Sequence, residues 1–476
     1  MSRRHLAAVL VLLTLFLAAC EGDTVDDPFP VRSPVGQPTS SDSLVIGLVG
    51  TLSGPESWRG EDAFEGADLA VHELNQDRLG GARPIELIAL DDEGDVDKAK
   101  ARIEEIAGLE RSIGLIYAGP PEALVASEDV LAARGIAAIS IFGDLYARED
   151  LTKHTFQAAP SKVWQARRLA SYLGRDRGYR KIGIIATNDD EGRSAIESLR
   201  ASVPPRTVVV GVTYVGSVLV EGSLDELRKA HVEAVVVDGS PAAFRSAIDT
   251  LTEMGALYEG TESARIASAR PRDRRARVAT GWWHPQLAGF DAAISPRVGT
   301  RVPPGTVASD SYARGVHYLP VPSFRSFRIA FEEWWDQEPL GWEQRSYDAV
   351  RLLGWGAERA EPGVDLSTEI EAIDDQRFGG LGITLGPDDH TMIDQTRVGL
   401  WVVPRAAATV KERDRLPENL PWVPLARGFS LNGKVTDVAP EDWDDLFRKA
   451  PPEGAPPPRN GLWRFGVATP RTDPWS

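Results

Sequence analysis

The sequence contains a single cysteine, Cys20, among its 476 residues. One cysteine cannot form an internal disulfide, so burial of apolar side chains must stabilise the fold without covalent cross-links. The same scarcity excludes cysteine-based zinc sites, iron–sulfur sites and thiol catalysis in the rest of the chain.

Long apolar runs are equally scarce. The longest, Leu6–Leu17, falls short of the ~20 residues that a membrane-spanning helix needs. It lies between the basic pair Arg3-Arg4 and the small pair Ala18-Ala19. This order is typical of a secretory signal peptide.

Cys20 follows the small residues directly, so Leu17–Cys20 resembles the lipobox of bacterial lipoproteins. In those proteins the cysteine is lipidated and becomes the new N-terminus. The alternative is an unmodified, buried cysteine near a cleavage site. The lipobox interpretation predicts an exported protein that is anchored by lipid to the outer face of the cytoplasmic membrane.

Positive charge is in short supply, because 53 Lys and Arg face 70 Asp and Glu and the formal net charge is −17. A protein that binds nucleic acid would present a basic face, so nucleic acid is not an expected partner. The motifs of a nucleophile elbow, a His-Glu-x-x-His zinc site and a phosphate-binding Walker lysine are also missing. We therefore expect no enzyme, no cofactor and no metal, although acidic clusters leave a carboxylate-pair hydrolase as an alternative.

The remainder of the chain alternates buried strands with amphipathic helices. Runs of apolar residues predict strands at Leu44–Gly50, Ile85–Leu90, Ile113–Tyr117, Ala137–Ile141, Lys181–Thr187, Val208–Val215, Ala234–Asp238 and Arg277–Thr280. Helical spacing of apolar residues predicts helices at Gly60–Leu74, Val96–Leu109, Glu122–Ala133, Lys162–Leu173, Arg193–Ser202, Leu224–Ala230 and Ala242–Met254. This alternation is typical of βαβ units and of parallel sheets covered by helices. Two such series, joined near Ala158–Pro160, predict two doubly wound lobes.

The last third of the chain is less regular. Helices are expected at Phe324–Trp335 and Arg345–Ala360, and a hairpin-like pair of strands at Phe378–Gly386 and Gly399–Val403. Beyond Pro404 the composition predicts no fold. Its tryptophans, among them Trp422, favour packing against the body because exposure of such large apolar rings is unfavourable.

Several of these segments resemble the leucine/isoleucine/valine-binding protein family. The likeness lies in Ile46–Gly54, Gly66–Val71, Pro84–Leu87 with Asp91–Asp95, Gly135–Ser140, Lys181–Ala186 and Tyr347–Val350. It extends over roughly Leu44–Val403, so the chain is similar to the type I periplasmic binding proteins, the extracytoplasmic receptors of ABC importers.

The resemblance implies an α/β fold in which two parallel-sheet lobes are joined by a three-stranded hinge. Its crossovers are expected near Ala158–Pro160, Arg314–Leu319 and Leu385–Pro387. The implied domains are a signal peptide at 1–19, a lipidated tether at 20–42, lobe 1 at 43–158 with 318–385, lobe 2 at 159–317 with 386–405, and an unassigned extension at 406–476. A ligand in the cleft contacts both lobes and stabilises the closed form.

Carried over to this sequence, the first-lobe pocket departs from the family. The family places an aromatic residue where Trp58 stands, either as a stacking wall or as a rim tryptophan that covers the hinge. It uses hydroxyls in the two loops that here contain Pro121-Glu122 and Phe142-Gly143-Asp144. Proline has no N–H to donate, and two carboxylates would repel a ligand carboxylate. An ordinary aliphatic amino acid is therefore doubtful.

In the second lobe, the candidate ligand-binding residues are Asp190, Glu191, Ser240, Trp282 and Trp283. Tryptophans beside acids would form an aromatic, anionic cage for a cationic or quaternary-ammonium ligand. The alternative is that Asp190 and its neighbours only cap a helix, where carboxylates are favoured anyway.

Together these features predict a lipoprotein that captures a small polar solute, an amino acid or an amide-like or cationic amino-acid-like compound. Its partners would be the permease subunits of an ABC importer, and it would touch the membrane only through its lipid. A ligand-sensing receptor of the same fold, without transport, is the alternative. Tethering by 20–42 would raise the effective concentration at the membrane partner.

Overall fold

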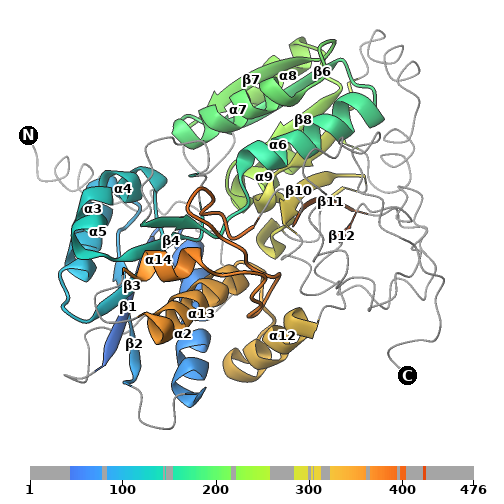
Figure 1. Cartoon of the computed structure of the whole chain (residues 1–476). Helices are drawn as coiled ribbons and strands as arrows, with labels where there is room; N and C mark the ends of the chain where they lie inside the picture. The colour runs from blue at the N-terminus through green and yellow to red at the C-terminus, as the bar shows by residue number, and fades with distance from the viewer. Residues whose placement is uncertain are drawn as a thin grey trace, which may run out of the picture. The chain divides into compact units, whose positions relative to one another are not determined.

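The structure is a computed structural model (Figure 1). It describes residues 43–77, 83–142, 145, 154–215, 221–257, 283–298, 302–303, 305–311, 322–360, 365–393, 397–403 and 422–424. Within these ranges, none of the helices is both long enough and apolar enough to span a bilayer. The signal segment, Cys20 and the tether lie outside the described residues.

The first sheet has five parallel strands in the order β2-β1-β3-β4-β5. The strands are β1 (Leu44–Gly50), β2 (Ile85–Asp91), β3 (Ser112–Ala118), β4 (Ala137–Ser140) and β5 (Thr155–Gln157). The interior strand β1 is buried along nearly its whole length, which explains its continuous apolar sequence.

Helices cover both faces of this sheet. They are α2 (Trp58–Asp77), α3 (Val96–Ala107), α4 (Pro121–Ala126), α5 (Glu128–Arg134), α12 (Pro322–Trp335), α13 (Glu343–Arg359) and α14 (Leu366–Glu371). Alternate side chains of β1 point to opposite faces, as the pleat requires. Ile46 and Leu48 join the core beneath α2 and α13, whereas Val45 and Val49 join the core beneath α3.

The second sheet has seven strands in the order β12-β11-β10-β9-β8-β6-β7. The strands are β6 (Lys181–Thr187), β7 (Val208–Tyr214), β8 (Ala234–Val237), β9 (Gln286–Gly289), β10 (Val307–Ser311), β11 (Val398–Val402) and β12 (Val423–Pro424). Five neighbouring strands are parallel to one another, namely β10, β9, β8, β6 and β7. β11 is antiparallel to both of its neighbours, β10 and β12. Two parallel sheets confirm the predicted α/β fold class.

The helical elements of the second lobe follow the same pattern. They are α6 (Lys162–Ala170), which continues into a π-helical stretch at Ser171–Asp176, α7 (Asp190–Ser202), α8 (Glu221–Lys229) and α9 (Pro241–Glu253). Two short 3₁₀ helices, η3 (Asp291–Ile294) and η4 (Pro296–Val298), come after β9.

The chain changes sheets after Gln157, the last residue of β5. Gln157 pairs in parallel with Thr391. The Gln157 N–H donates to the His390 carbonyl at 2.9 Å, and the Gln157 carbonyl accepts from the Met392 N–H at 2.8 Å. The segment before α6 therefore lies beside the segment that returns to β11. The crossover expected near Arg314–Leu319 lies outside the described residues.

One expectation for the strands was wrong. The pair Phe378–Gly386 and Gly399–Val403 does not form a hairpin, because β11 pairs with β10 and β12. Residues 376–389 instead make isolated bridges among themselves. The next strand after α9 that the structure describes is β9, and the predicted strand Arg277–Thr280 lies outside the described residues.

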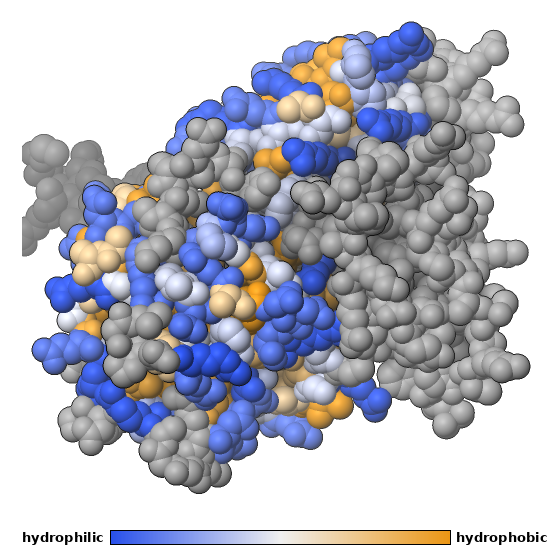
Figure 2. All heavy atoms as spheres, viewed as in Figure 1, coloured by the Kyte–Doolittle hydropathy of each residue, from blue (hydrophilic) through white to orange (hydrophobic). Residues whose placement is uncertain are grey.

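The prediction that the C-terminal extension packs on the body is confirmed where the structure describes it. Trp422 is 1% exposed, and β12 beside it extends the second sheet. The outer surface is otherwise polar. In the view of Figure 2, hydrophilic residues cover much of the described face, and the apolar residues occur in small groups.

Candidate functional site

A cavity of about 760 Å³ lies between the loops that follow the strands of both sheets. The first sheet contributes the loops after all five of its strands, and the second contributes those after β6, β7, β8 and β9. Ligands of open parallel sheets bind beyond the carboxyl ends of the strands. This cavity is therefore the candidate site.

The first-lobe wall is an aromatic cluster. The Trp58 ring lies 4.5 Å from that of Trp342 and 5.4 Å from that of Phe142, in an edge-to-face arrangement with the latter. Phe142 and Trp342 are 5.7 Å apart. All three line the cavity, so the rings form one rigid apolar surface.

Arg59 lies against this aromatic wall. Its guanidinium carbon is 5.4 Å from the Trp58 centroid and 5.7 Å from the Phe142 centroid, and its Nε is 3.6 Å from Glu56. Burial disfavours the charge, but the nearby carboxylates, Glu56 first and Glu191 of the other lobe next, raise the pKa of Arg59 above its usual value.

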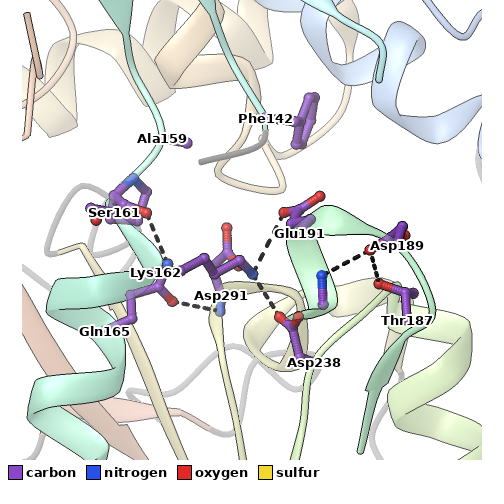
Figure 3. Close-up of polar contacts among 12 residues, drawn as sticks. Phe142, Ala159, Ser161, Lys162, Gln165, Thr187, Asp189, Glu191, Asp238 and Asp291 are labelled. Atoms are coloured by element: carbon purple, nitrogen blue, oxygen red, sulfur yellow. Dashed lines mark hydrogen bonds and ion pairs between the residues drawn. The ribbon is translucent and has the colours of Figure 1, made fainter. Parts of the chain in front are cut away.

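The second-lobe wall is built around Lys162, the first residue of α6. Its Nζ donates a 2.8 Å hydrogen bond to Asp238 and lies 3.5 Å from Asp291 and 3.9 Å from Glu191. The Figure 3 view shows these carboxylates arranged around the ammonium from three separate elements. They stand after β8, at the start of η3 and in the first turn of α7.

Burial and charge set the protonation of this cluster. Burial lowers the pKa of Lys162, but the three surrounding carboxylates outweigh it and raise that pKa above the usual value. Burial raises the pKa of Asp238 to about 6, an effect that Lys162 opposes. The cluster therefore places three carboxyl groups around one ammonium group.

Six predicted site residues line the cavity, and the structure brings them together from both lobes. They are Trp58, Pro121, Glu122, Phe142, Glu191 and Ser240. Ser240 also caps α9, because its Oγ accepts from the Ala243 N–H at 3.2 Å. Gly143, Asp144 and Trp282 lie outside the described residues.

Trp283 and Asp190 do not line the cavity. Trp283 is buried, and its Nε1 donates to the Val232 carbonyl at 2.9 Å, before the amino end of β8. The cavity lies at the carboxyl end of that strand, so Trp283 is at the opposite edge of the sheet. Asp190 is exposed and pairs with Arg193 on the outer turn of α7. An aromatic cage that includes Trp283 is therefore excluded.

Sequence reasoning missed Lys162, Asp291, Arg59 and Trp342. A lysine at the first position of a helix was a usable signal, since a cation is disfavoured there. Asp291 was missed because β9, the strand before it, was not predicted, and Gly281–His284 was taken as the pocket loop instead. Trp342 gave no local signal, because it meets Trp58 only in the folded chain.

Buried ion pairs connect the two lobes beside the cavity. Arg345 of α13 donates to Asp310 of β10 at 2.9 Å, and its other nitrogen is 3.4 Å from Asp291. Arg297 of η4 donates to Asp62 of α2 at 2.9 Å. Asp291 thus faces Lys162 with one oxygen and Arg345 with the other. In the part of the chain that the structure describes, no group of three or more His, Cys, Asp or Glu side chains is arranged to hold a metal ion.

Comparison with known proteins agrees with this architecture. Residues 43–271 match the family model described as periplasmic binding protein. The branched-chain amino acid transporter substrate-binding protein LivJ from Streptococcus pneumoniae, in complex with isoleucine, superposes with a TM-score of 0.61 at 16% identity, covering 76% of this chain and 95% of that chain.

Two further structures have similar values. A type 1 periplasmic binding protein from Bordetella pertussis gives a TM-score of 0.62 at 19% identity, covering 77% of this chain and 98% of that chain. A possible leucine/isoleucine/valine-binding protein from Rhodopirellula baltica gives 0.60 at 17% identity, covering 79% and 96%. No curated protein matches the sequence.

Two parallel-sheet lobes with a cavity between their strand ends define the class of two-lobed solute-binding proteins. The described residues have the fold of the type I periplasmic binding proteins, including branched-chain amino acid-binding ones, and residues 43–271 match the periplasmic binding protein family model. This likeness favours a solute-binding protein over the hydrolase alternative.

Proposed function

We propose that the protein is an extracytoplasmic lipoprotein that captures a small amino-acid-like solute with a positively charged group and delivers it to an ABC importer. The solute would bind in the cavity between the lobes. Closure of the lobes around it would create the form that the importer recognises.

The observation that carries the charge assignment is the composition of the cavity wall. Seven carboxylates line it, against two cations. The carboxylates are Glu56, Glu93, Glu122, Asp189, Glu191, Asp238 and Asp291, and the cations are Arg59 and Lys162. In a site partly removed from water, this excess favours a cationic group and disfavours an anion.

Some of these carboxylates also have structural tasks. Asp189 accepts from the Gly192 N–H at 2.8 Å as the cap of α7, and Glu93 pairs with the exposed Lys98 at 2.6 Å. Glu191 is held less firmly, since its closest cation is Lys162 at 3.9 Å. We therefore assign Glu191 as the first contact of the ligand's positive group, opposite the aromatic wall of Trp58 and Phe142.

The loop after β3 provides few donors for a ligand carboxylate, because Pro120 and Pro121 have no N–H. A carboxylate on the ligand would instead use Arg59, the cation of the first-lobe wall. The apolar remainder of a ligand would lie against the aromatic rings.

Delivery to an importer rests on the similar structures and on Cys20. Similar structures include ABC transporter substrate-binding proteins from Desulfitobacterium hafniense and Sphaerobacter thermophilus. Lipidation of Cys20 would hold the protein at the membrane, and residues 20–42 would serve as its tether. Uptake of the bound solute by membrane vesicles with the cognate permease tests delivery, and binding without uptake would favour the sensing alternative.

Isothermal titration of the mature protein tests the charge assignment. We expect heat from betaines and other solutes with a single positive group, and affinity that falls with ionic strength. Glu191→Gln should weaken the binding at least tenfold, whereas Asp190→Asn, one residue earlier but outside the cavity, should not change it. Binding confined to anionic or uncharged solutes, or equal effects of the two variants, would contradict the proposal.

A further inference from the structure

Lys162 occupies an unusual position for a lysine. It is the first residue of α6, after the N-cap Ser161, where the positive end of the helix dipole disfavours a cation by about 0.3–1 kcal/mol. It is also 7% exposed, and a buried charge is unfavourable unless it is paired. The surroundings that retain it must therefore be strongly favourable to an ammonium group.

Those surroundings have the composition of an ammonium-binding site. Carboxylates of Asp238, Asp291 and Glu191 lie within 3.9 Å of Nζ, and the Phe290 ring centroid lies 5.0 Å from it. Charged acceptors beside an aromatic face are what proteins use to bind cationic ligands. Here the chain's own side chain fills that place.

Contacts other than Lys162 hold the backbone at Asp291 and Asp238 and one oxygen of the Asp291 side chain. The Asp291 N–H donates to Gln165 Oε1 at 3.1 Å, and the Asp291 side chain also faces Arg345 at 3.4 Å. The Tyr214 hydroxyl donates to the Asp238 carbonyl at 3.3 Å. Removal of the lysine side chain should therefore leave a formed site for an ammonium.

We propose that Lys162 determines the specificity of the cavity by filling this second-lobe ammonium site with its own side chain. The cavity then selects ligands with a single positive group, because no second ammonium site is open to a diamine. The selection for one positive group rests on the proposed function, whereas occupancy of the site by the lysine ammonium does not.

Chemical rescue of Lys162→Ala by propylamine tests the inference. Propylamine supplies the three methylene-chain carbons and the ammonium that the substitution removes, and 1-propanol is the matched neutral probe. Lys98→Ala is the control variant: Lys98 lies 2.6 Å from Glu93, but both side chains are about half exposed. The readout is the melting temperature of the purified mature protein.

We expect Lys162→Ala to melt below the wild type and propylamine to raise its melting temperature by at least ~2 °C, with 1,4-diaminobutane doing the same. Propanol should have no effect, and neither amine should shift the wild type or Lys98→Ala. Equal shifts in all three proteins, or none in a folded Lys162→Ala, would overturn the inference.

If Lys162→Ala does not fold, Lys162→Ala with Asp238→Asn replaces it, because that variant removes one carboxylate together with the ammonium. The amine-dependent shift is again expected, and its absence overturns the inference. Since the assay needs no natural solute, it can succeed even if the proposed cationic ligand is wrong. A failed titration with cationic solutes beside a successful rescue would separate the two proposals.

Discussion

The buried pair Arg345–Asp310 offers the sharpest test of how the two lobes are held together. Arg345 is 1% exposed and Asp310 is fully buried, and they are 2.9 Å apart. Arg345 belongs to α13, which packs against α2 and β3 of the first lobe, whereas Asp310 belongs to β10 of the second sheet. Removal of either partner leaves a buried charge.

Breaking a buried pair from one side typically destabilises by 3–5 kcal/mol. For Asp310→Asn we expect about 3 kcal/mol, the lower end, because Arg345 keeps Asp291 at 3.4 Å. Arg345→Met should destabilise by about 3–5 kcal/mol, because the buried Asp310 then loses the guanidinium 2.9 Å away. The double variant Arg345→Met with Asp310→Leu should be less destabilised than either single one, because it leaves no isolated charge at this pair.

Urea unfolding followed by tryptophan fluorescence and far-ultraviolet circular dichroism measures these differences. Coincidence of the two transitions must be checked, because lobes that unfold separately would not give one free energy. Lys98→Met is the control, since an exposed pair contributes only about 0.2–1 kcal/mol. If the double variant is destabilised by the sum of the single effects, the two side chains do not interact and the reasoning is refuted.

Three further predictions concern the cavity. Trp58→Ala should destabilise the protein by about 3–5 kcal/mol and weaken solute binding in titration, whereas Trp283→Phe should lower stability by about 1 kcal/mol and leave affinity unchanged. The pKa of Asp238 is raised to about 6, so ionisation of this carboxyl opposes folding. The free energy of unfolding should therefore fall as the pH rises towards 6 and stay constant, as far as Asp238 is concerned, above that pH. Affinity for a cationic solute should accordingly weaken below pH 6, and Asp238→Asn should flatten that profile between pH 5 and 7.5. Gly239→Ala should weaken binding, because Gly239 has a φ of +144° and an added Cβ would lie 1.9 Å from the Tyr214 hydroxyl. Thermal melts would measure the loss of stability and titration the loss of affinity.

Local patterns predicted most of the elements well. The run Leu44–Gly50 is β1, and the spacing of apolar residues in Gly60–Leu74 lies within α2. These succeeded because a parallel strand buried on both faces, or a helix buried on one, imposes its period on neighbouring residues. The order of such elements was sufficient to predict two parallel sheets.

The prediction failed where an element is short or its partner is distant. β9 has only the four residues Gln286–Gly289 and begins with a polar side chain, so no apolar run revealed it. Because β9 was not predicted, the predicted site contained Trp283 and lacked Asp291. Likewise, β11 lies 87 residues beyond the end of β10 in the chain, and pairing at such a separation leaves no trace in local periodicity.

By itself, the sequence determined the alternation of strands and helices, the acidity of the loops and the aromatic residue at Trp58. These properties depend on neighbouring residues and on composition. Only the tertiary structure decided that Lys162 meets the carboxylates of Glu191, Asp238 and Asp291, the last of them 129 positions away. The reason is physical: strand order, and not chain proximity, brings the loops of a parallel sheet to one edge, and the charge of a site is set by which side chains meet there.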